Sequence, residues 1–203
     1  MKPRYFRWSQ DNREDDSDSS TWFLKIELIG YDEWDLKTGH TIEKWDLNTL
    51  AYYDDRYAEQ TDFPSTRFML PVYSPRLKSL VQEKGVVGIQ YLPLKIRHSL
   101  TSVEIYGYHL VNYLKIVDCL DRVHSVYGTW TKDNLLFWEK RPWMLGTFRD
   151  VKRVVLDPDK IGDSQLFRLW GWEDVVIIRD DLKYAIEETG ISGCWFTELA
   201  LSE

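Results

Sequence analysis

The residues of this chain best suited to catalysis are Asp118, Asp121, His124 and Ser125, which lie close together in the sequence. A carboxylate, an imidazole and a hydroxyl are the groups that nucleophilic catalysis uses, so the cluster would suit a hydrolase. No glycine-built turn presents the serine, however, and a strand would place the two aspartates on opposite faces. We therefore predict a structural role, in which Asp121 caps the turn after a strand, with a hydrolase as the alternative.

Metal and cofactor chemistry has little support in the sequence. No histidine belongs to a His-Glu-x-x-His pair, no cysteine and histidine spacing matches a zinc site, and no nucleotide-binding glycine loop occurs. The run that begins Asp157-Pro158-Asp159 starts like a calcium loop, but Ile161 and Arg168 occupy positions that need oxygen ligands. We expect no cofactor and no metal. The four histidines of the chain, none of which has metal-site spacing, are His40, His98, His109 and His124.

The cysteines and the hydropathy pattern indicate a compartment. Cys119 and Cys194 form no Cys-x-x-Cys pair. Two such separate cysteines are typical of small buried apolar residues in a reducing compartment. The chain opens without a basic segment followed by an apolar one, and no apolar run approaches the roughly 18 residues of a spanning helix. We therefore expect a cytoplasmic protein that does not enter a membrane.

The negative charge is concentrated in the first third of the chain. Residues 1–65 hold 15 acidic and 8 basic residues, whereas the remaining 138 hold 18 of each. An acidic, aromatic segment repels nucleic acid and attracts basic surfaces, unless it is only a solvated face. The ten tryptophans leave two interpretations open, because they suit either a β-rich core or exposed interface anchors.

The first 66 residues are predicted to form short elements. Residues 5–8 suit a strand, and residues 11–20 are polar enough for a mobile loop. Alternating apolar residues predict a strand over 22–29. We expect a hairpin turn at 37–40 with a returning strand over 41–45, and a long irregular connection over 46–66.

A strand–helix–turn–strand module is predicted over residues 68–96. An apolar run at 68–72 precedes Ser74 and Pro75, which suit the N-cap and the first residue of a helix. The apolar face of this helix recurs every three to four residues, and Gly85 ends it. A strand that is interrupted or lies at an edge at Pro93 follows.

The same design returns over residues 175–196. A buried strand at 175–178 leads to a helix whose first turn contains Asp180 and Asp181, where negative charge is favoured. Any strand–helix–strand unit can acquire similar residues at the start and end of its helix. We nevertheless interpret the two modules as an internal pseudo-repeat with an offset of 105 positions. The pairs that coincide are Leu77 with Leu182, Lys78 with Lys183, Gly85 with Gly190, Gly88 with Gly193, and Tyr91 with Phe196.

Between the modules, strands are predicted over 103–121 and 151–156, a turn at 157–159 and a further strand over 165–170. The stretch 129–148 holds three tryptophans and Arg141. The pattern predicts an α+β fold with a strand-rich mixed sheet and few helices. We divide the chain into an acidic aromatic region, 1–66, packed on an α+β domain, 67–203.

The central stretch from His109 to Ser125 carries a family resemblance. Its asparagine, two aspartates and serine resemble the centre of immunity protein family 11 of bacterial polymorphic toxin systems. The segments 154–157, 166–169 and 175–196 agree with that family, so the resemblance covers about residues 68–199. The four matching residues, which we interpret as fold determinants, are Asn112, Asp118, Asp121 and Ser125.

The resemblance implies a non-enzymatic protein that binds and neutralises a cognate toxin domain delivered by a neighbouring cell. Many toxin domains are nucleases, whose substrate groove must be basic, so an acidic partner would complement such a groove. The alternatives are a hydrolase that reverses the toxin's modification and a non-catalytic scaffold or ligand-binding protein. The predicted toxin-binding residues are Glu14, Asp15, Asp16, Asp18, Trp34, Trp45, Tyr52, Tyr53, Asp54 and Asp55.

Overall fold

The computed structural model describes residues 2–11, 22–53 and 59–202 of the chain. Strand accounts for 37% and helix for 17%, which confirms the predicted α+β class with a strand-rich mixed sheet and few helices. The predicted loop at 11–20 lies outside the described residues, apart from Asp11. The α-helices that the structure describes are α1 (Pro75–Glu83), α2 (Pro158–Ile161) and α3 (Asp180–Glu188).

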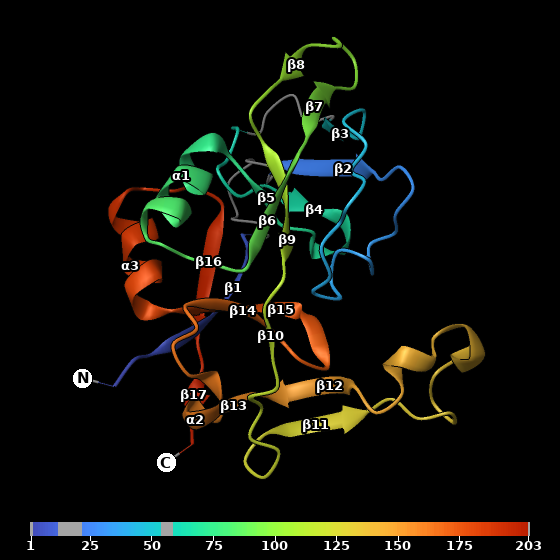
Figure 1. Ribbon diagram of the computed structural model, residues 1–203, viewed down its shortest axis with the longest axis vertical. Coiled ribbons are helices and arrows are strands. Elements are labelled where there is room, and N and C mark those ends of the chain that lie inside the picture. The colour runs from blue at the N-terminus through green and yellow to red at the C-terminus, as the bar shows by residue number, and fades with distance from the viewer. Residues whose placement is uncertain (1, 12–21, 54–58, 203) are drawn as a thin grey trace, which may run out of the picture.

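Three sheets form the body of the molecule (Figure 1). The first has the order β10 (Ile116–Val117), β14 (Leu166–Leu169), β15 (Trp172–Arg179), β1 (Tyr5–Gln10), β16 (Cys194–Glu198). The second has the order β4 (Ser65–Thr66), β2 (Phe23–Glu27), β3 (Leu50–Tyr53), β7 (Lys95–His98), β8 (Glu104–Ile105). The third has the order β5 (Val72–Tyr73), β9 (His109–Tyr113), β6 (Ile89–Pro93). The separate pairs are β11 (Val126–Thr129) with β12 (Phe148–Arg153), and β13 (Val155–Leu156) with β17 (Ala200–Leu201).

Burial on both faces explains the unbroken apolar run of β15. Val176 and Ile178 point into a core that also contains buried residues of α1 and α3. Val175 and Ile177 point into a second core on the other face of the same sheet. Because successive side chains alternate between the faces, a strand covered on both sides must be apolar at every position.

The two predicted modules have equivalent elements. Helix α3 and strand β16 follow α1 and β6 at an offset of 105 residues at both ends. In each module a central strand runs antiparallel to both of its neighbours, β9 between β5 and β6, and β1 between β15 and β16. The register is also equivalent, since His109 faces Tyr73 and Pro93 whereas Phe6 faces Ile178 and Glu198. That the modules are a repeat stays a prediction.

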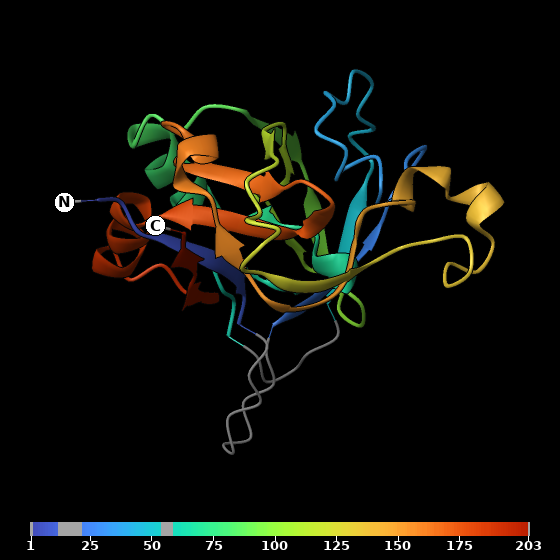
Figure 2. The same cartoon turned by 90° about the horizontal axis from the view of Figure 1, so that it is seen from below.

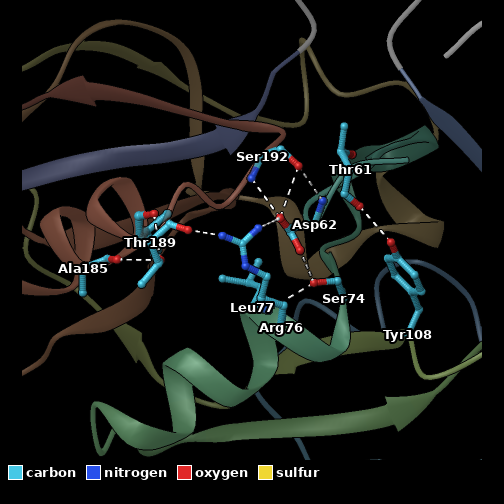
Figure 3. Close-up of polar contacts among 10 residues, drawn as sticks. Thr61, Asp62, Ser74, Arg76, Leu77, Tyr108, Ala185, Thr189 and Ser192 are labelled. Carbon is cyan, nitrogen blue, oxygen red and sulfur yellow. Dashed lines mark hydrogen bonds and ion pairs between the residues drawn. The ribbon is translucent and has the colours of Figure 1, made fainter. Parts of the chain in front are cut away.

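Asp62 connects the two modules through its carboxylate (Figure 3). One oxygen accepts a hydrogen bond from the N-cap hydroxyl of Ser74 at 2.6 Å, which ties it to the start of α1. The other accepts from the backbone N–H of Ser192, in the loop after α3, at 3.0 Å. Arg76 lies 3.3 Å from the same carboxylate and also donates to the carbonyl of Thr189. The Asp62 carboxylate therefore links the start of α1 to the loop that follows α3.

The predicted hairpin at 37–45 is wrong. Residues 41–45 form no strand, and the antiparallel partner of β2 is β3, which lies inside the stretch predicted to be irregular. The segment is instead held by side chains of the third sheet. Gln90 accepts from the N–H of Ile42 at 2.9 Å and donates to its carbonyl at 2.8 Å, and Asn112 donates to the carbonyl of His40 at 2.8 Å.

Two further expectations need correction. The predicted turn at 157–159 begins a one-turn helix, α2, because Asp157 caps it by accepting the N–H of Asp159. The predicted strand at 151–156 is divided between β12, which pairs with β11, and β13, which pairs with β17. The two parts have different partners because the chain leaves one sheet at Val154.

Strands from the first 66 residues are hydrogen-bonded into the sheets of the rest. Strand β1 lies between β15 and β16, and β3 runs parallel to β7. The predicted division at residue 66 therefore separates segments that share two sheets, and its status as a domain boundary stays a prediction. Hydrophobic cores lie on both faces of the first sheet and under the second.

Strands β11 and β12 pack against this body, whereas the loop that connects them extends away from it. We call residues 126–153 the arm. Figures 1 and 2 both show it projecting to one side, with its loop farthest from the sheets. The loop contains two short 3₁₀ turns, Trp138–Lys140 and Pro142–Met144.

Candidate functional site

The candidate catalytic residues lie at the turn before β11, and their bonds are structural. Asp121 accepts the backbone N–H groups of Val123 and His124 at 2.9 and 3.0 Å, so it closes the turn that follows β10. Asp118 accepts two hydrogen bonds from Arg122, at 2.9 and 2.8 Å, on the exposed surface. These contacts have the form of a turn cap and a surface ion pair.

The serine of this cluster is not paired with the imidazole. The Ser125 hydroxyl donates to the carbonyl of Val155 at 3.2 Å and accepts from its N–H at 2.9 Å, so it links the turn to β13. The His124 ring bonds to Asp121 at 2.7 Å, and this bond holds the pKa of the Asp121 carboxyl at about 2. A nucleophile activated by a base needs these two groups within hydrogen-bond reach of each other, and that pairing is not formed.

The fourth residue of the resemblance, Asn112, lies in β9, one residue before the end of the strand. Its side chain is fully buried, and besides the bond to His40 it donates to Gln90 at 3.1 Å. Asn112 therefore fixes the loop after β2 against the third sheet, a long-range contact that spacing in the sequence does not reveal.

Neither thiol is suited to act as a nucleophile. Burial raises the pKa of Cys119 to about 12, and burial likewise raises that of Cys194 to about 12. Within the described residues no group of three or more histidine, cysteine or acidic side chains could hold a metal ion. The helices in that part of the chain are all too short or too polar to cross a membrane.

A groove of about 510 Å³ lies between the arm and the body. It is lined by residues from the loop after β2, from β10, from both sides of the arm and from the hairpin that joins β14 to β15. Tryptophan is the commonest residue type in the lining. The tryptophans that line it are Trp34, Trp130, Trp143, Trp170 and Trp172.

A buried ion pair forms part of the groove lining. The Lys37 side chain is only 4% exposed, and its ammonium pairs with the carboxylate of Asp174 on β15. The same ammonium lies 5.3 Å from the centre of the Trp34 ring, which adds a cation–π contact. The Asp174 carboxylate, which is 30% exposed, thus compensates an ammonium whose burial would otherwise be costly.

The wall of the groove depends on a glycine. Gly171 has a φ of +77° in the turn between β14 and β15, and a Cβ there would meet the Phe148 ring at 3.1 Å. Phe148 packs edge-on against Trp170 with ring centres 5.8 Å apart, and Arg122 lies 5.7 Å from each ring. The end of β12 next to the loop of the arm is thus packed directly against the sheet.

A second cavity of about 310 Å³ adjoins the groove, since Asp174 lines both. Arg7 lines the second cavity and lies 5.6 Å from the ring of Trp172, which lines the first. Trp195 and Met69 at the second cavity are 41% and 42% exposed. Exposed apolar side chains therefore occur at the second cavity too, which meets the groove at the charged residue Asp174.

The four predicted contact residues that the structure describes lie at different places, and the role of the set in toxin binding stays a prediction. Trp34 lines the groove, whereas Trp45 stacks on Tyr31 and donates to the carbonyl of Pro93 at 2.8 Å. Tyr52 lines a third cavity beside β2, and Tyr53 packs against Trp22. The acidic residues Glu14, Asp15, Asp16, Asp18, Asp54 and Asp55 lie outside the described residues.

Most of the groove was missed from sequence because its parts are far apart along the chain. The tryptophan-rich stretch 129–148 is the part of the groove that the sequence could have indicated. It has no strand or helix pattern, so its aromatic side chains have no obvious place in a core. Of the ten tryptophans, Trp8 and Trp22 are less than 5% exposed, whereas Trp143 is 55% exposed. That exposed tryptophans act as interface anchors stays a prediction.

Comparison with protein families decides the class. The model of the Immunity protein family (Imm11) matches residues 16–200. The chain belongs to this family. An immunity protein acts against a toxin, so the partner of this Imm11 member is a cognate toxin. The match begins 52 residues before the start of the resemblance found by inspection and includes most of the acidic first third. A search of curated proteins found no match.

Proposed function

We propose that this Imm11 protein is a non-enzymatic inhibitor that binds a cognate toxin domain in the cytoplasm and covers its active site. Family membership supplies the toxin as partner, and the surface formed by the tryptophan groove and the arm carries the proposal of direct binding. Aromatic side chains in partly desolvated pockets are the residues that dominate binding energy in protein interfaces.

The bonding of the catalytic candidates supports inhibition by binding and not by chemistry. Ser125 and Asp121 are engaged with backbone groups, and no described residue pairs the Ser125 hydroxyl with a base. The hydrolase alternative would need those residues to be released from the turn that they hold. We therefore favour a stoichiometric complex.

The acidic first third adds an electrostatic component to the proposal. Its net charge of −7 would complement a toxin with a basic active groove, as a nuclease has. Opposite charges accelerate association more than they strengthen the final complex. A nuclease is therefore the toxin class that we propose for this partner.

Co-expression with the toxin encoded by the adjacent gene tests this function. We expect rescued growth, and a complex of defined stoichiometry when the two purified proteins are mixed. Rescue by catalytic amounts of the chain, without a complex, would overturn the proposal in favour of an enzyme. A chain that neither binds the toxin nor rescues growth would overturn it as well.

A further inference from the structure

The tip of the arm exposes large apolar side chains that the fold could have buried. Leu136 is 80% exposed, Phe137 71% and Trp143 55%, whereas Leu135 beside them is buried at 5%. A side chain of this size normally loses its contact with water, so adjacent exposed ones mark a contact surface. Leu135 anchors the loop, which leaves its neighbours to face outward.

The backbone holds these residues in place. Phe137 adopts a left-handed conformation with φ of +57°, which is unfavourable for a bulky residue. Its carbonyl accepts the N–H of Lys140 at 2.9 Å. Asn134 accepts the N–H of Thr131 at 2.8 Å and donates to the carbonyl of Thr129 at 3.1 Å. These hydrogen bonds hold the tip in one conformation before it binds a partner. Binding therefore costs little additional conformational entropy of the loop.

The arm also differs from the rest of the chain in charge. It holds six basic and three acidic residues, a net charge of +3, while the other 175 residues hold 20 basic and 30 acidic ones. The cations lie on aromatic faces, with the Lys132 ammonium 4.4 Å from the Trp138 ring centre and that of Lys140 5.9 Å from the Phe137 ring centre. The loop of the arm, 130–147, holds Lys132, Lys140 and Arg141 against Asp133 and Glu139, so a small excess of positive charge lies around the apolar tip.

Building on the proposed function, we infer that the arm is a docking element whose Leu136–Phe137 tip enters an apolar recess with an acidic rim on the toxin domain. The occupant follows from complementarity, because the basic surround would be repelled by a basic surface. This contact lies on a different part of the toxin from the basic groove that the acidic first third would face.

The test uses the full chain and the purified toxin domain encoded by the adjacent gene. Leu136→Ala with Phe137→Ala should weaken binding by about a hundredfold or more, as expected for anchor residues. Lys132→Glu with Lys140→Glu should weaken it as well, and most at low salt. The matched control is Leu100→Ala with Val103→Ala, which truncates two residues, each 57% exposed, on the hairpin of β7 and β8. That control should bind as the unaltered chain does.

The outcomes separate the two proposals. Unaltered binding by the tip variant, with an unaltered urea midpoint, would overturn the docking role of the arm and leave the inhibitor function intact. Tighter binding after charge reversal would show that the recess is basic and overturn the inferred partner chemistry. A dimer of the chain alone that the tip variant dissociates would overturn it in favour of a second copy. Failure of the unaltered chain to bind would instead overturn the inhibitor function.

Discussion

The Asp62 carboxylate accepts hydrogen bonds from both the backbone N–H and the hydroxyl of Ser192, at 3.0 and 3.2 Å, although the two residues are 130 positions apart. The Asp62 side chain is 12% exposed, so its bonds are shielded from water. Since Ser74 donates to the same carboxylate at the start of α1, one acid holds both helical modules together.

Replacing Asp62 by Asn should therefore destabilise the fold. The donors of Ser74 and Ser192 would lose an ionised acceptor, and an amide N–H₂ would face some of them. We expect the free energy of unfolding to fall by about 2–3 kcal/mol, measured by urea denaturation. The control is Glu59→Gln, an exposed residue of the same segment, which should leave the midpoint unchanged. Equal midpoints for both variants would contradict this role of Asp62.

Features that depend on contacts between residues close in sequence could be predicted, whereas features that depend on residues far apart along the chain could not. Helix α1 was predicted with its N-cap, and both α1 and α3 with the glycine that follows them, because these residues act on their own neighbours. The pairing partners of β1 could not be predicted, because nothing near Tyr5–Gln10 indicates strands more than 150 residues away. The false strand at 41–45 has the same cause, since Gln90 and Asn112 decide the conformation there.

The candidate site was even harder to predict from the sequence. The groove unites Trp34, Trp130 and Trp172 from three separate segments, and only the fold brings them together. The capping role of Asp121, by contrast, was expected, because an aspartate that accepts N–H groups two and three residues later needs no distant partner.

The Lys37–Asp174 pair predicts an asymmetric mutational effect. Asp174→Asn leaves a buried ammonium without its counter-ion, so we expect a loss of about 2–4 kcal/mol in unfolding free energy. Lys37→Met should be milder because Asp174 is 30% exposed and can be hydrated. Combining the two substitutions should recover part of the loss. A double variant as unstable as the sum of the single ones would show that the residues are not coupled.

His109 predicts a dependence of stability on pH. Its ring nitrogen lies 2.9 Å from the Lys78 ammonium, and burial together with this cation lowers the pKa of His109 below its ordinary value of 6.5. The unfolded chain therefore takes up the proton first as the pH falls, so stability is full above pH 6.5 and declines below it.

Urea midpoints at pH 5 and pH 7.5 measure this effect. We expect His109→Gln to reduce the difference between them, whereas His40→Gln, at an exposed position, should keep it. Lys78→Met should bring the pKa of His109 closer to its ordinary value, and NMR titration of the ring can follow this change. A difference in midpoint that is identical in all of these variants would exclude His109 as its source.

The acidic segment before β2 gives a kinetic prediction. Replacing Glu14, Asp15, Asp16 and Asp18 by Lys should slow association with the toxin about tenfold at low salt, because charge complementarity acts mainly on the encounter. Stopped-flow or surface-binding kinetics at two salt concentrations would measure it. Glu83→Lys with Glu188→Lys, two exposed acids at the ends of α1 and α3, is the charge-matched control for the double variant Asp15→Lys with Asp16→Lys, which should also slow association. If both variants associate at the wild-type rate, the segment is not part of the contact surface.

The cluster at the turn before β11 offers the sharpest distinction between inhibitor and enzyme. We expect His124→Ala to protect cells as well as the unaltered chain, because its ring is 63% exposed and bonds only to the cap residue Asp121 among the contacts described. Asp121→Ala should lower stability, because the N–H groups of Val123 and His124 lose their acceptor. Protection by Asp121→Ala, normalised to the folded amount, should nevertheless be retained. Growth rescue and toxin affinity are measured side by side, since a variant that binds the toxin at full strength yet fails to protect would establish the hydrolase instead.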